Sequence, residues 1–365
     1  MKIAVLGVGL IGGSIGLAAR ERLDHQVAGH DPDRGTLDRA LAVGAIDTAA
    51  ASVEEACAGA EAVFCAAPVA KLTELASAAL AAGDSGTVVT DVGSTKRDIV
   101  AALGSDERFI GGHPLAGVEA AGVENARADL FEGARWYLTP ESGGSSGILY
   151  DRLQRLLSGL GARVQAIDPE THDRLMATVS HLPHVVANVL VSQAAEELTR
   201  DSERMPEVGP SFRDTTRVAG ANPAIWGDIF ASNGEAVAEA VELAAQRLRE
   251  AAELIRAGER GAVAEWHAAA GADRRRLLEA ELSGGELREL RVVVANRPGT
   301  IAELALALGE AGVNIEDMAL HPAADMTSGA VSLWVAGDEQ AARAIELVRK
   351  LGHGVSVMDG DGVGS

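Results

Sequence analysis

The sequence predicts an α/β protein of three domains: a Rossmann-type doubly wound sheet, an all-helical domain and a C-terminal ferredoxin-like βαββαβ domain. Three observations support this. The first half alternates short apolar runs with Ala-rich amphipathic stretches, the strand signal disappears after Asp168, and a βαββαβ pattern returns after the linker at residues 283–285. The 365 residues fit two or three domains of roughly 100–200 residues each.

We expect the first domain, a dinucleotide-binding one, to span residues 1–168. Its short apolar runs predict strands at residues 2–6, 26–30, 62–66, 87–91, 109–111, 136–139 and 163–167. Between them, amphipathic stretches predict helices at residues 11–22, 36–43, 69–82 and 95–103. The stretch at 141–147, rich in Ser and Gly, is expected to be a surface loop.

The second domain is expected at residues 169–283 and contains helical periodicity only. The helical windows are 169–200, 222–257 and 260–281. They are more apolar than separate amphipathic helices need to be, which predicts an extensive interface and a homodimer.

The third domain is expected at residues 286–360. Its pattern predicts strands at 290–295, 313–321, 330–336 and 355–358, with helices at 299–311 and 338–351.

Composition narrows the function. The net charge of −21 and pI near 4.8 disfavour nucleic-acid and membrane-surface partners, and an anionic substrate would need locally concentrated basic groups. Two cysteines, Cys57 and Cys65, form neither a disulfide framework nor a zinc pattern. The uncharged run at residues 3–19 contains five glycines and lacks a cleavage signal, so we expect a soluble, cytoplasmic protein.

A dinucleotide fingerprint follows the first strand. The segment Gly7-Val8-Gly9-Leu10-Ile11-Gly12 opens a helix, and Asp31 lies 19 residues after Gly12, at the end of the second strand. Such glycines allow a tight turn and close approach of a pyrophosphate to the helix N-terminus, while the acid accepts hydrogen bonds from ribose. Asp31 favours NAD because its carboxylate would repel the 2′-phosphate of NADP. The nearby Arg34 could pair with that phosphate, so NADP stays an alternative. A glycine-rich turn without nucleotide is the alternative.

Other polar residues end predicted strands at the crevice. Pro68 follows the strand at residues 62–66 and is expected to contact the cofactor, while Cys65 within that strand is a core residue rather than a nucleophile. Asp91 and Ser94 either face the cofactor or cap the next helix. His113, between glycine-rich segments after a short strand, is a candidate catalytic group, with a structural role as the alternative.

The helical domain contains two further clusters. His181 and His184 lie three residues apart, but no third ligand has suitable spacing, so we expect no metal site. Arg213 and Arg217 are basic residues in an acidic chain and suit a carboxylate ligand, unless they form a solvated helix face.

The ordered set of motifs resembles the prephenate dehydrogenase family of tyrosine biosynthesis. The matching motifs are GVGLIGGSIG, DVGSTK, GGHPLAG followed by Glu119, SHLPH, and FRDTTR followed by Trp226. The distal segments at residues 296–299 and 312–315 resemble an ACT regulatory domain.

The resemblance implies NAD-dependent oxidative decarboxylation of prephenate to 4-hydroxyphenylpyruvate. In that family pattern His113 takes the proton of the C4 hydroxyl, Ser94 orients it beside the nicotinamide, and Arg217 holds the ring carboxylate. The remaining matches contact or shape the substrate pocket, partly across the subunit interface: Ser180, His181, His184, Glu119, Asp214 and Trp226. The segment before FRDTTR departs from the family pattern, with residues 209–211 replacing a glycine run.

The ACT resemblance implies that an amino acid, most simply L-tyrosine, lowers activity. The expected effector-binding residues are Asn296, Pro298, Gly299 and Asn314. Asn296 stands where the family usually has Asp, which removes a charge that pairs with an amino-acid ammonium. A domain that only dimerises is the alternative.

Three other functions compete. Arogenate dehydrogenase would act on a substrate with an amino group, whereas His184 favours the keto acid. A 3-hydroxyacid dehydrogenase would be expected to have a catalytic Lys in its helical domain, which the motifs lack. A non-catalytic amino-acid sensor is disfavoured by His113, Ser94 and Arg217.

Overall fold

The computed structural model describes residues 1–116, 120–140, 147–199, 208–281, 287–295, 297–322 and 328–358. These form two compact units, one from Met1 to Leu248 and one from Arg249 to Ser365. Glu119, Asn296, and the predicted loop and linker at residues 141–146 and 283–285 lie outside the described residues.

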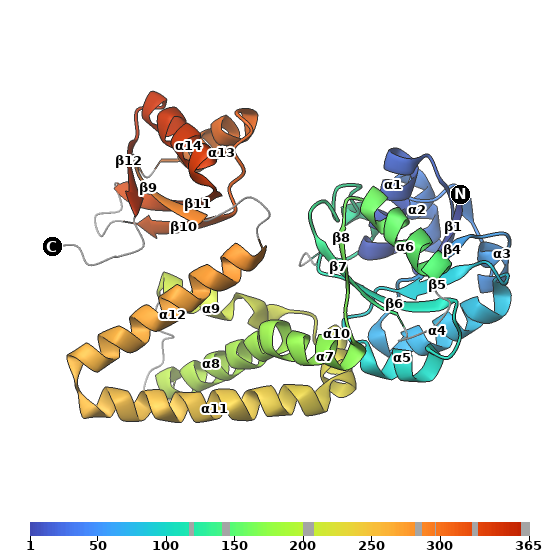
Figure 1. Cartoon of the computed structure of the whole chain (residues 1–365), viewed down its shortest axis with the longest axis horizontal. Helices are drawn as coiled ribbons and strands as arrows, with labels where there is room; N and C mark the ends of the chain where they lie inside the picture. Colours follow the sequence, from blue (N-terminus) through green and yellow to red (C-terminus); the bar gives the residue numbers. More distant parts are fainter. Residues whose placement is uncertain are drawn as a thin grey trace. The chain divides into compact units, whose positions relative to one another are not determined.

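The first unit is built on an eight-stranded sheet in the order β3-β2-β1-β4-β5-β6-β7-β8 (Figure 1). Neighbouring strands are parallel except that β7 runs antiparallel to β6. The strands are β1 (Lys2–Leu6), β2 (Gln26–His30), β3 (Thr48–Ala49), β4 (Ala62–Cys65), β5 (Val88–Asp91), β6 (Phe109–Pro114), β7 (Arg135–Thr139) and β8 (Arg163–Ala166).

Helices cover both faces of this sheet, because its central strands are apolar on both sides and need two layers of cover. One buried core includes side chains of α1 (Leu10–Leu23), α2 (Arg34–Ala42) and α6 (Gly147–Gly159). The other includes α3 (Val53–Cys57), α4 (Val69–Ala82) and α5 (Arg97–Leu103). The predicted doubly wound Rossmann-type sheet is confirmed.

The strand that contains His113 is longer than predicted. We expected a strand at residues 109–111 with His113 after it, but β6 continues to Pro114. Its parallel pairing with β5 ends at Ile110, and antiparallel pairing with β7 then carries it onward through Gly111, Gly112 and His113. The pattern also missed β3, α3 and α6, which are short or border an undescribed segment.

Helices follow the sheet, as predicted. The expected helix at 169–200 divides into α7 (Pro169–Met176), a π-helical turn (Ala177–His181) and α8 (Leu182–Thr199). Pro183 has no N–H for a helical hydrogen bond, which accounts for irregular winding just before it. Next come α9 (Pro210–Thr216), the 3-10 turn Arg217–Gly220 and α10 (Pro223–Ser232).

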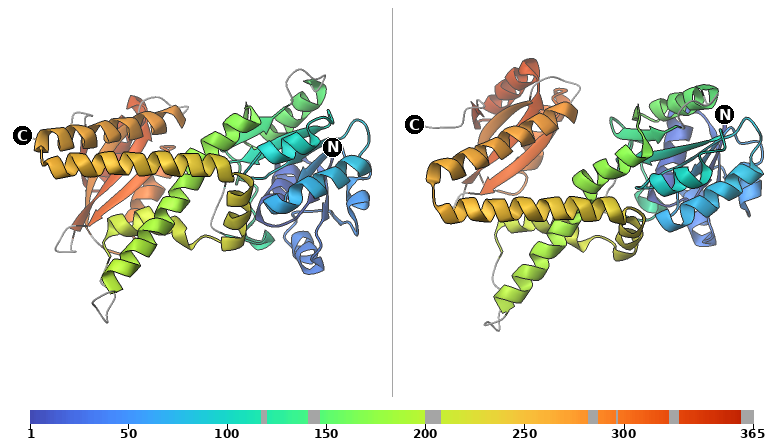
Figure 2. Two further views of the ribbon diagram at one scale, coloured as in Figure 1. Left: turned by 90° about the horizontal axis from the view of Figure 1, so that it is seen from below. Right: turned by 60° about the horizontal axis from the view of Figure 1, so that its bottom comes forward.

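Two long helices follow. α11 (Gly234–Ala257) ends where Gly258 adopts a positive φ of 70°, and the chain turns there into α12 (Arg260–Glu281), as Figure 2 shows. The predicted window at 260–281 agrees with α12.

The end of the chain has the predicted βαββαβ order. Its elements are β9 (Leu287–Ala295), α13 (Thr300–Glu310), β10 (Asp317–Pro322), β11 (Ser328–Ala336), α14 (Asp338–Lys350) and β12 (Gly354–Met358). The antiparallel sheet has the order β10-β11-β9-β12 and packs one face on α13 and α14. β10 begins later than the expected residue 313, because Val313 is buried in the core beside α13 instead of joining the sheet.

Candidate functional site

A cleft of about 670 Å³ lies at the carboxyl ends of β1, β4, β5 and β6 in the first unit. This is the edge at which open parallel sheets bind ligands. Many of the predicted site residues line it together: Gly9, Leu10, Ile11, Gly12, Pro68, Ser94, His113, Ser180, His181 and Trp226. The cleft therefore joins the glycine loop of the Rossmann-type domain to side chains of the helical domain.

The glycine loop fits a dinucleotide. Gly7 has φ of 93°, and a Cβ there would lie 2.2 Å from the Ala66 carbonyl oxygen. A Cβ on Gly12 would lie 1.9 Å from the Gly7 oxygen, so helix and turn approach closely. Gly9 instead faces open space, and the first N–H groups of α1 behind it have no partners within the helix. Together they leave room for a pyrophosphate at a positive helix end.

Asp31 lies directly after β2, next to this loop. Its Oδ2 accepts a hydrogen bond from the Val8 backbone N–H at 3.1 Å, and its Oδ1 accepts one from Asp33 at 2.9 Å. These bonds hold the carboxylate at the place where a Rossmann domain contacts the adenosine ribose. Arg34 pairs with Asp38 at 3.4 Å on the exposed face of α2.

His113 lies at the end of β6, 8% exposed, and lines the cleft. Its Nδ1 is 2.9 Å from Nε2 of His172, whose own Nδ1 is 2.8 Å from an oxygen of Asp173. Burial, followed by the neighbouring His172, Lys96 and His181, lowers the pKa of His113 well below its ordinary value. His113 is therefore neutral at pH 7, as a general base must be. Ser94, expected to orient His113, lines the same cleft. The hydrogen bond of His113 in the described structure is instead made with His172.

A fully buried ion pair underlies this corner. Lys96 Nζ contacts Asp91, and both side chains have no exposed surface. Asp91 also accepts hydrogen bonds from the backbone N–H groups of Gly93 at 2.8 Å and Gly112 at 3.0 Å. It thus connects β5 to the residue before His113. Burial lowers the pKa of Lys96, and Asp91 opposes that shift.

Four residues of this site were not among the candidates identified from the sequence: Lys96, His172, Asp173 and Asn233. Asp173 accepts from the backbone of Lys96 and Arg97, 77 and 76 residues away, so only the tertiary fold reveals the connection. Asn233 donates to the Asp173 carbonyl at 2.7 Å and lies 3.3 Å from His181 Nδ1. The one local signal was the dipeptide His172-Asp173 in an otherwise ordinary helix start.

Aromatic rings form the helical side of the cleft. Trp226 on α10 stacks on His184, with ring centroids 3.4 Å apart, and meets His181 edge-on at 5.9 Å. Burial lowers the pKa of His181 to about 4, so this ring is also neutral at pH 7. His184 does not line the cleft itself; it packs behind Trp226, which does.

Two predicted substrate residues lie elsewhere on the helical region. Arg217 begins the 3-10 turn after α9, and Asp214 lies within α9; both are exposed and neither lines the cleft. The structure therefore brings together the proposed cofactor and catalytic residues, but not these two.

The cysteines are core residues. Cys57 and Cys65 are buried, and burial raises the pKa of Cys57 to about 11 and holds that of Cys65 well above its ordinary value. Among the described residues, no group of three or more His, Cys, Asp or Glu side chains is arranged to hold a metal ion.

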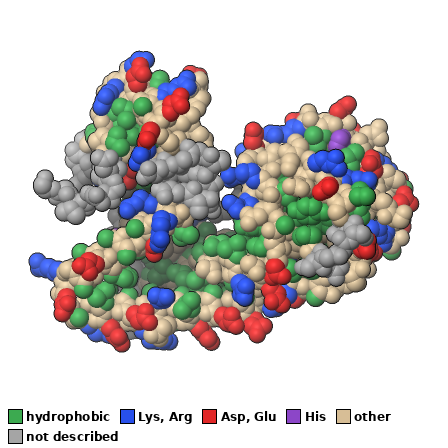
Figure 3. All heavy atoms as spheres, in the orientation of Figure 1, with side chains coloured by type: hydrophobic (Ala, Val, Ile, Leu, Met, Phe, Trp, Pro, Cys, Tyr) green, Lys and Arg blue, Asp and Glu red, His purple; other side chains and the backbone are tan. Residues whose placement is uncertain are grey.

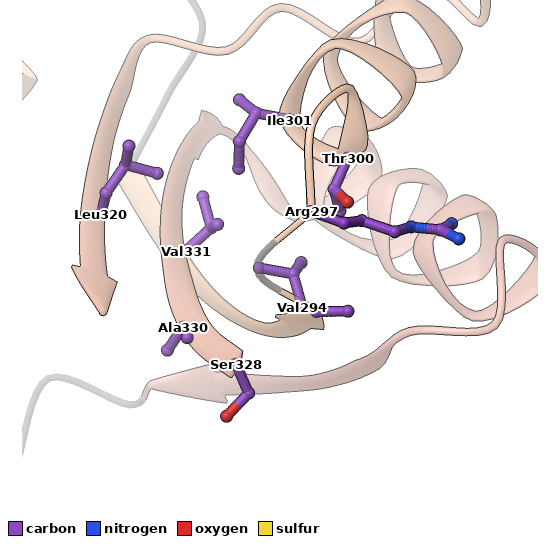
Figure 4. A pocket seen from close by; sticks show the side chains of 10 residues that line it. Val294, Arg297, Thr300, Ile301, Leu320, Ser328, Ala330 and Val331 are labelled. Carbon is purple, nitrogen blue, oxygen red and sulfur yellow. The ribbon is translucent and has the colours of Figure 1, made fainter. Parts of the chain in front are cut away.

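A second, small pocket of about 100 Å³ lies in the second unit, between β9, β10, β11 and the start of α13 (Figure 4). Apolar side chains line most of it, including Val294, Ile301, Leu320 and Val331. Thr300 also lines it, 2% exposed, and its buried hydroxyl has no hydrogen-bond partner among the described residues.

The predicted effector residues lie beside this pocket in sequence. Pro298 and Gly299 form the exposed turn just before Thr300, and Gly299 has φ of 91°. The Asn314 amide donates to Glu316 at 2.9 Å.

Comparisons with known proteins agree with this architecture. Residues 15–166 match the model of the prephenate dehydrogenase nucleotide-binding domain, and residues 168–268 match that of its dimerization domain. A prephenate dehydrogenase of Bacillus subtilis is 37% identical over 64% of this chain and 65% of its own length. The match thus spans just under two thirds of that relative.

Solved structures are similar as well. A. aeolicus prephenate dehydrogenase, in complex with hydroxyphenyl propionate and NAD+, has a TM-score of 0.71 and 31% identity, covering 76% of this chain and 98% of that one. Synechocystis arogenate dehydrogenase has a TM-score of 0.66 and 26% identity, covering 76% and 100%. Because the two domain models together match more than half of the chain, the chain belongs to the prephenate dehydrogenase family of NAD-dependent oxidoreductases.

Proposed function

We propose that this protein is a cytoplasmic enzyme that oxidatively decarboxylates prephenate to 4-hydroxyphenylpyruvate with NAD. The observation that carries the proposal is the position of His113. It is a neutral, buried imidazole in the same cleft as a dinucleotide-binding glycine loop. A general base beside a hydride acceptor is what oxidation of an alcohol requires.

The residues present fit NAD. The loop from Gly7 to Gly12 and the start of α1 would hold its pyrophosphate, and Asp31 would accept hydrogen bonds from its adenosine ribose. When bound, NAD supplies a hydride acceptor for C4 of the substrate. Ser94 and Pro68 line the cleft between this loop and His113, where the nicotinamide end is expected.

His113 moves the proton in this scheme. Its imidazole takes the proton of the C4 hydroxyl as C4 loses hydride and becomes a ketone. The ring carboxylate then leaves as carbon dioxide, and the electron pair of the broken C–C bond makes the ring aromatic. His113 returns its proton to the resulting phenolate oxygen, so the side chain ends as it began.

Substrate binding is assigned through the family pattern. Ser180, His181 and Trp226 line the same cleft as His113, and His184 supports the Trp226 ring by stacking on it. Three further residues complete the proposed site: Arg217, which would bind the ring carboxylate, Asp214 and Glu119. Since Arg217 and Asp214 are exposed in the single chain, their part in the site depends on movement or on a second subunit.

We further propose a homodimer formed through the helical domain. The segment Pro169–Glu196 is apolar enough to cross a membrane by length and composition, yet only 22% of its most apolar stretch is buried within the chain. Val189 on α8 and Leu243 and Leu248 on α11 are more than half exposed. Hydrophobic side chains also interrupt the charged surface over α11 and α12 (Figure 3). A second copy would cover such surfaces.

The test is NADH formation by the purified chain with prephenate and, separately, with arogenate, each with NAD and NADP. We expect turnover of prephenate with NAD, and a fall in kcat of roughly 100- to 10,000-fold for His113→Asn with little change in KM. Preference for arogenate would establish the second candidate, which the similarity to an arogenate dehydrogenase supports. No turnover of either substrate would favour a non-catalytic sensor.

We propose that the C-terminal unit is an ACT domain through which L-tyrosine lowers activity. Its βαββαβ order and the pocket at the start of α13 support this, because the Thr300 hydroxyl lies beside a helix N-terminus and has no partner in the described part of the chain (Figure 4). Asn296, Pro298, Gly299 and Asn314 are the expected neighbours of the ligand backbone.

Thr300→Val tests the regulatory site in the full-length chain. Valine has nearly the same shape and removes only the hydroxyl, so we expect weaker tyrosine inhibition with activity unchanged in its absence. Thr48→Val, at an exposed site in β3, is the matched control. Inhibition by tyrosine that is identical in all three proteins and competitive with prephenate would place tyrosine in the catalytic cleft instead.

A further inference from the structure

We propose that His172 and Asp173 are positioning residues that fix the tautomer of His113, leaving its Nε2 as the proton acceptor. The inference rests on the proposed function, since it takes His113 as the base. The three side chains form one line, from Asp173 Oδ1 to His172 Nδ1 at 2.8 Å and from His172 Nε2 to His113 Nδ1 at 2.9 Å.

The three groups are shielded from water. His172 has no exposed surface, Asp173 is 2% exposed and His113 is 8% exposed. The rings of His113 and His172 meet edge-on, with an interplanar angle of 72°. Tyr137 on β7 packs edge-on against His172 from another side, with ring centroids 5.6 Å apart. The surroundings therefore allow little rotation of the middle ring.

The position of each proton follows from the carboxylate. Asp173, when ionised, only accepts hydrogen bonds, so the proton of a neutral His172 lies on Nδ1. Its Nε2 then has a lone pair and accepts from His113 Nδ1–H. A neutral His113 with its proton on Nδ1 has a lone pair on Nε2, the atom that must accept the substrate proton.

Asp173 is itself held in place. Its two oxygens accept hydrogen bonds from the backbone N–H groups of Lys96 at 2.8 Å and Arg97 at 2.9 Å, at the start of α5. Its backbone carbonyl accepts from Asn233 at 2.7 Å. Burial raises the pKa of Asp173, but the hydrogen bond from His172 and those from the backbone of Arg97 and Lys96 outweigh it and lower the pKa overall. The carboxylate therefore stays ionised and can compensate the charge that His113 gains during turnover.

Two substitutions of His172 separate the hydrogen bond from packing. In His172→Asn the amide nitrogen takes the place of Nδ1 and can still donate to Asp173, but the side chain is too short to reach His113. In His172→Gln the amide oxygen takes the place of Nε2 and can still accept from His113. Both variants remove the ring, so packing changes are shared.

The experiment measures kcat and KM for prephenate and the Kd of NADH for wild type, H172N, H172Q and H113N. We expect kcat of H172N to fall about 100-fold, with KM and Kd within about threefold of wild type. H172Q should recover about tenfold of that loss. Asp173→Asn removes the negative charge that compensates a protonated His113, so its kcat should fall as far as that of H172N.

Three results would overturn the inference: an H172N kcat within about threefold of wild type, equal losses in H172N and H172Q, or a loss confined to KM. Should H172N fail to bind NADH, Asp173→Asn decides, and an unchanged kcat overturns the inference. If H113N keeps the wild-type kcat, His113 is not the base, and the positioning role fails with the proposed function. A loss in H113N without a loss in H172N would instead refute the positioning role alone.

Discussion

Replacing Lys96 with Met should destabilise the amino-terminal unit strongly, because it leaves the Asp91 carboxylate buried without its cation. Both side chains have no exposed surface, and within the described residues two backbone N–H groups, of Gly93 and Gly112, remain to hold the charge. Removal of one partner of a buried pair costs about 3–5 kcal/mol. For a unit of this size, that corresponds to a fall in Tm of roughly 6–20 °C.

Scanning calorimetry measures this loss, and the transition of the amino-terminal unit is the one that NAD shifts upward. Lys71→Met, on the exposed side of α4, is the matched control and should leave that transition unchanged. Adding Asp91→Asn to Lys96→Met should recover part of the loss, because no charge then remains buried. A Lys96→Met variant that loses less than about 1 kcal/mol, or no more than the control, would refute the assigned role of the pair.

Three further outcomes follow. Asp31→Ala should weaken NAD binding and reduce the preference for NAD over NADP, measured as the Kd of each cofactor. Strong use of NADP by the wild type would instead indicate that Arg34 determines the cofactor preference. Trp226→Ala should mainly raise KM for prephenate, since it removes the ring that stacks on His184, and an effect confined to kcat would contradict this. His181, with a pKa of about 4 in the fold against 6.5 when unfolded, should make the unit less stable as pH falls from about 6.5 towards 4, by up to about 3 kcal/mol. In denaturant titrations across that pH range, the free energy of unfolding of His181→Asn should change less with pH than that of the wild type. An identical pH dependence in the two proteins would exclude His181 as the cause of the stability loss.

The sequence alone determined the architecture, because that depends on periodicity and local turn chemistry. Alternating apolar runs predicted the strands of the doubly wound sheet, and the glycine fingerprint with Asp31 predicted the dinucleotide loop. The βαββαβ order of the last unit was also predictable, since each of its elements has its own hydrophobic pattern. His113 was identified from its place near a strand end, although the strand itself runs further, because its partner β7 extends it.

Only the tertiary structure decided which groups act on His113. His172 and Asp173 come from α7, and no periodicity in the chain indicates that they meet β6 and the start of α5. The burial of Lys96 was equally hidden, because a lysine in sequence is normally a surface residue and becomes a core residue only when the fold supplies a carboxylate such as Asp91. Local patterns determine elements, whereas hydrogen bonds between residues 59 to 77 positions apart exist only once those elements have packed.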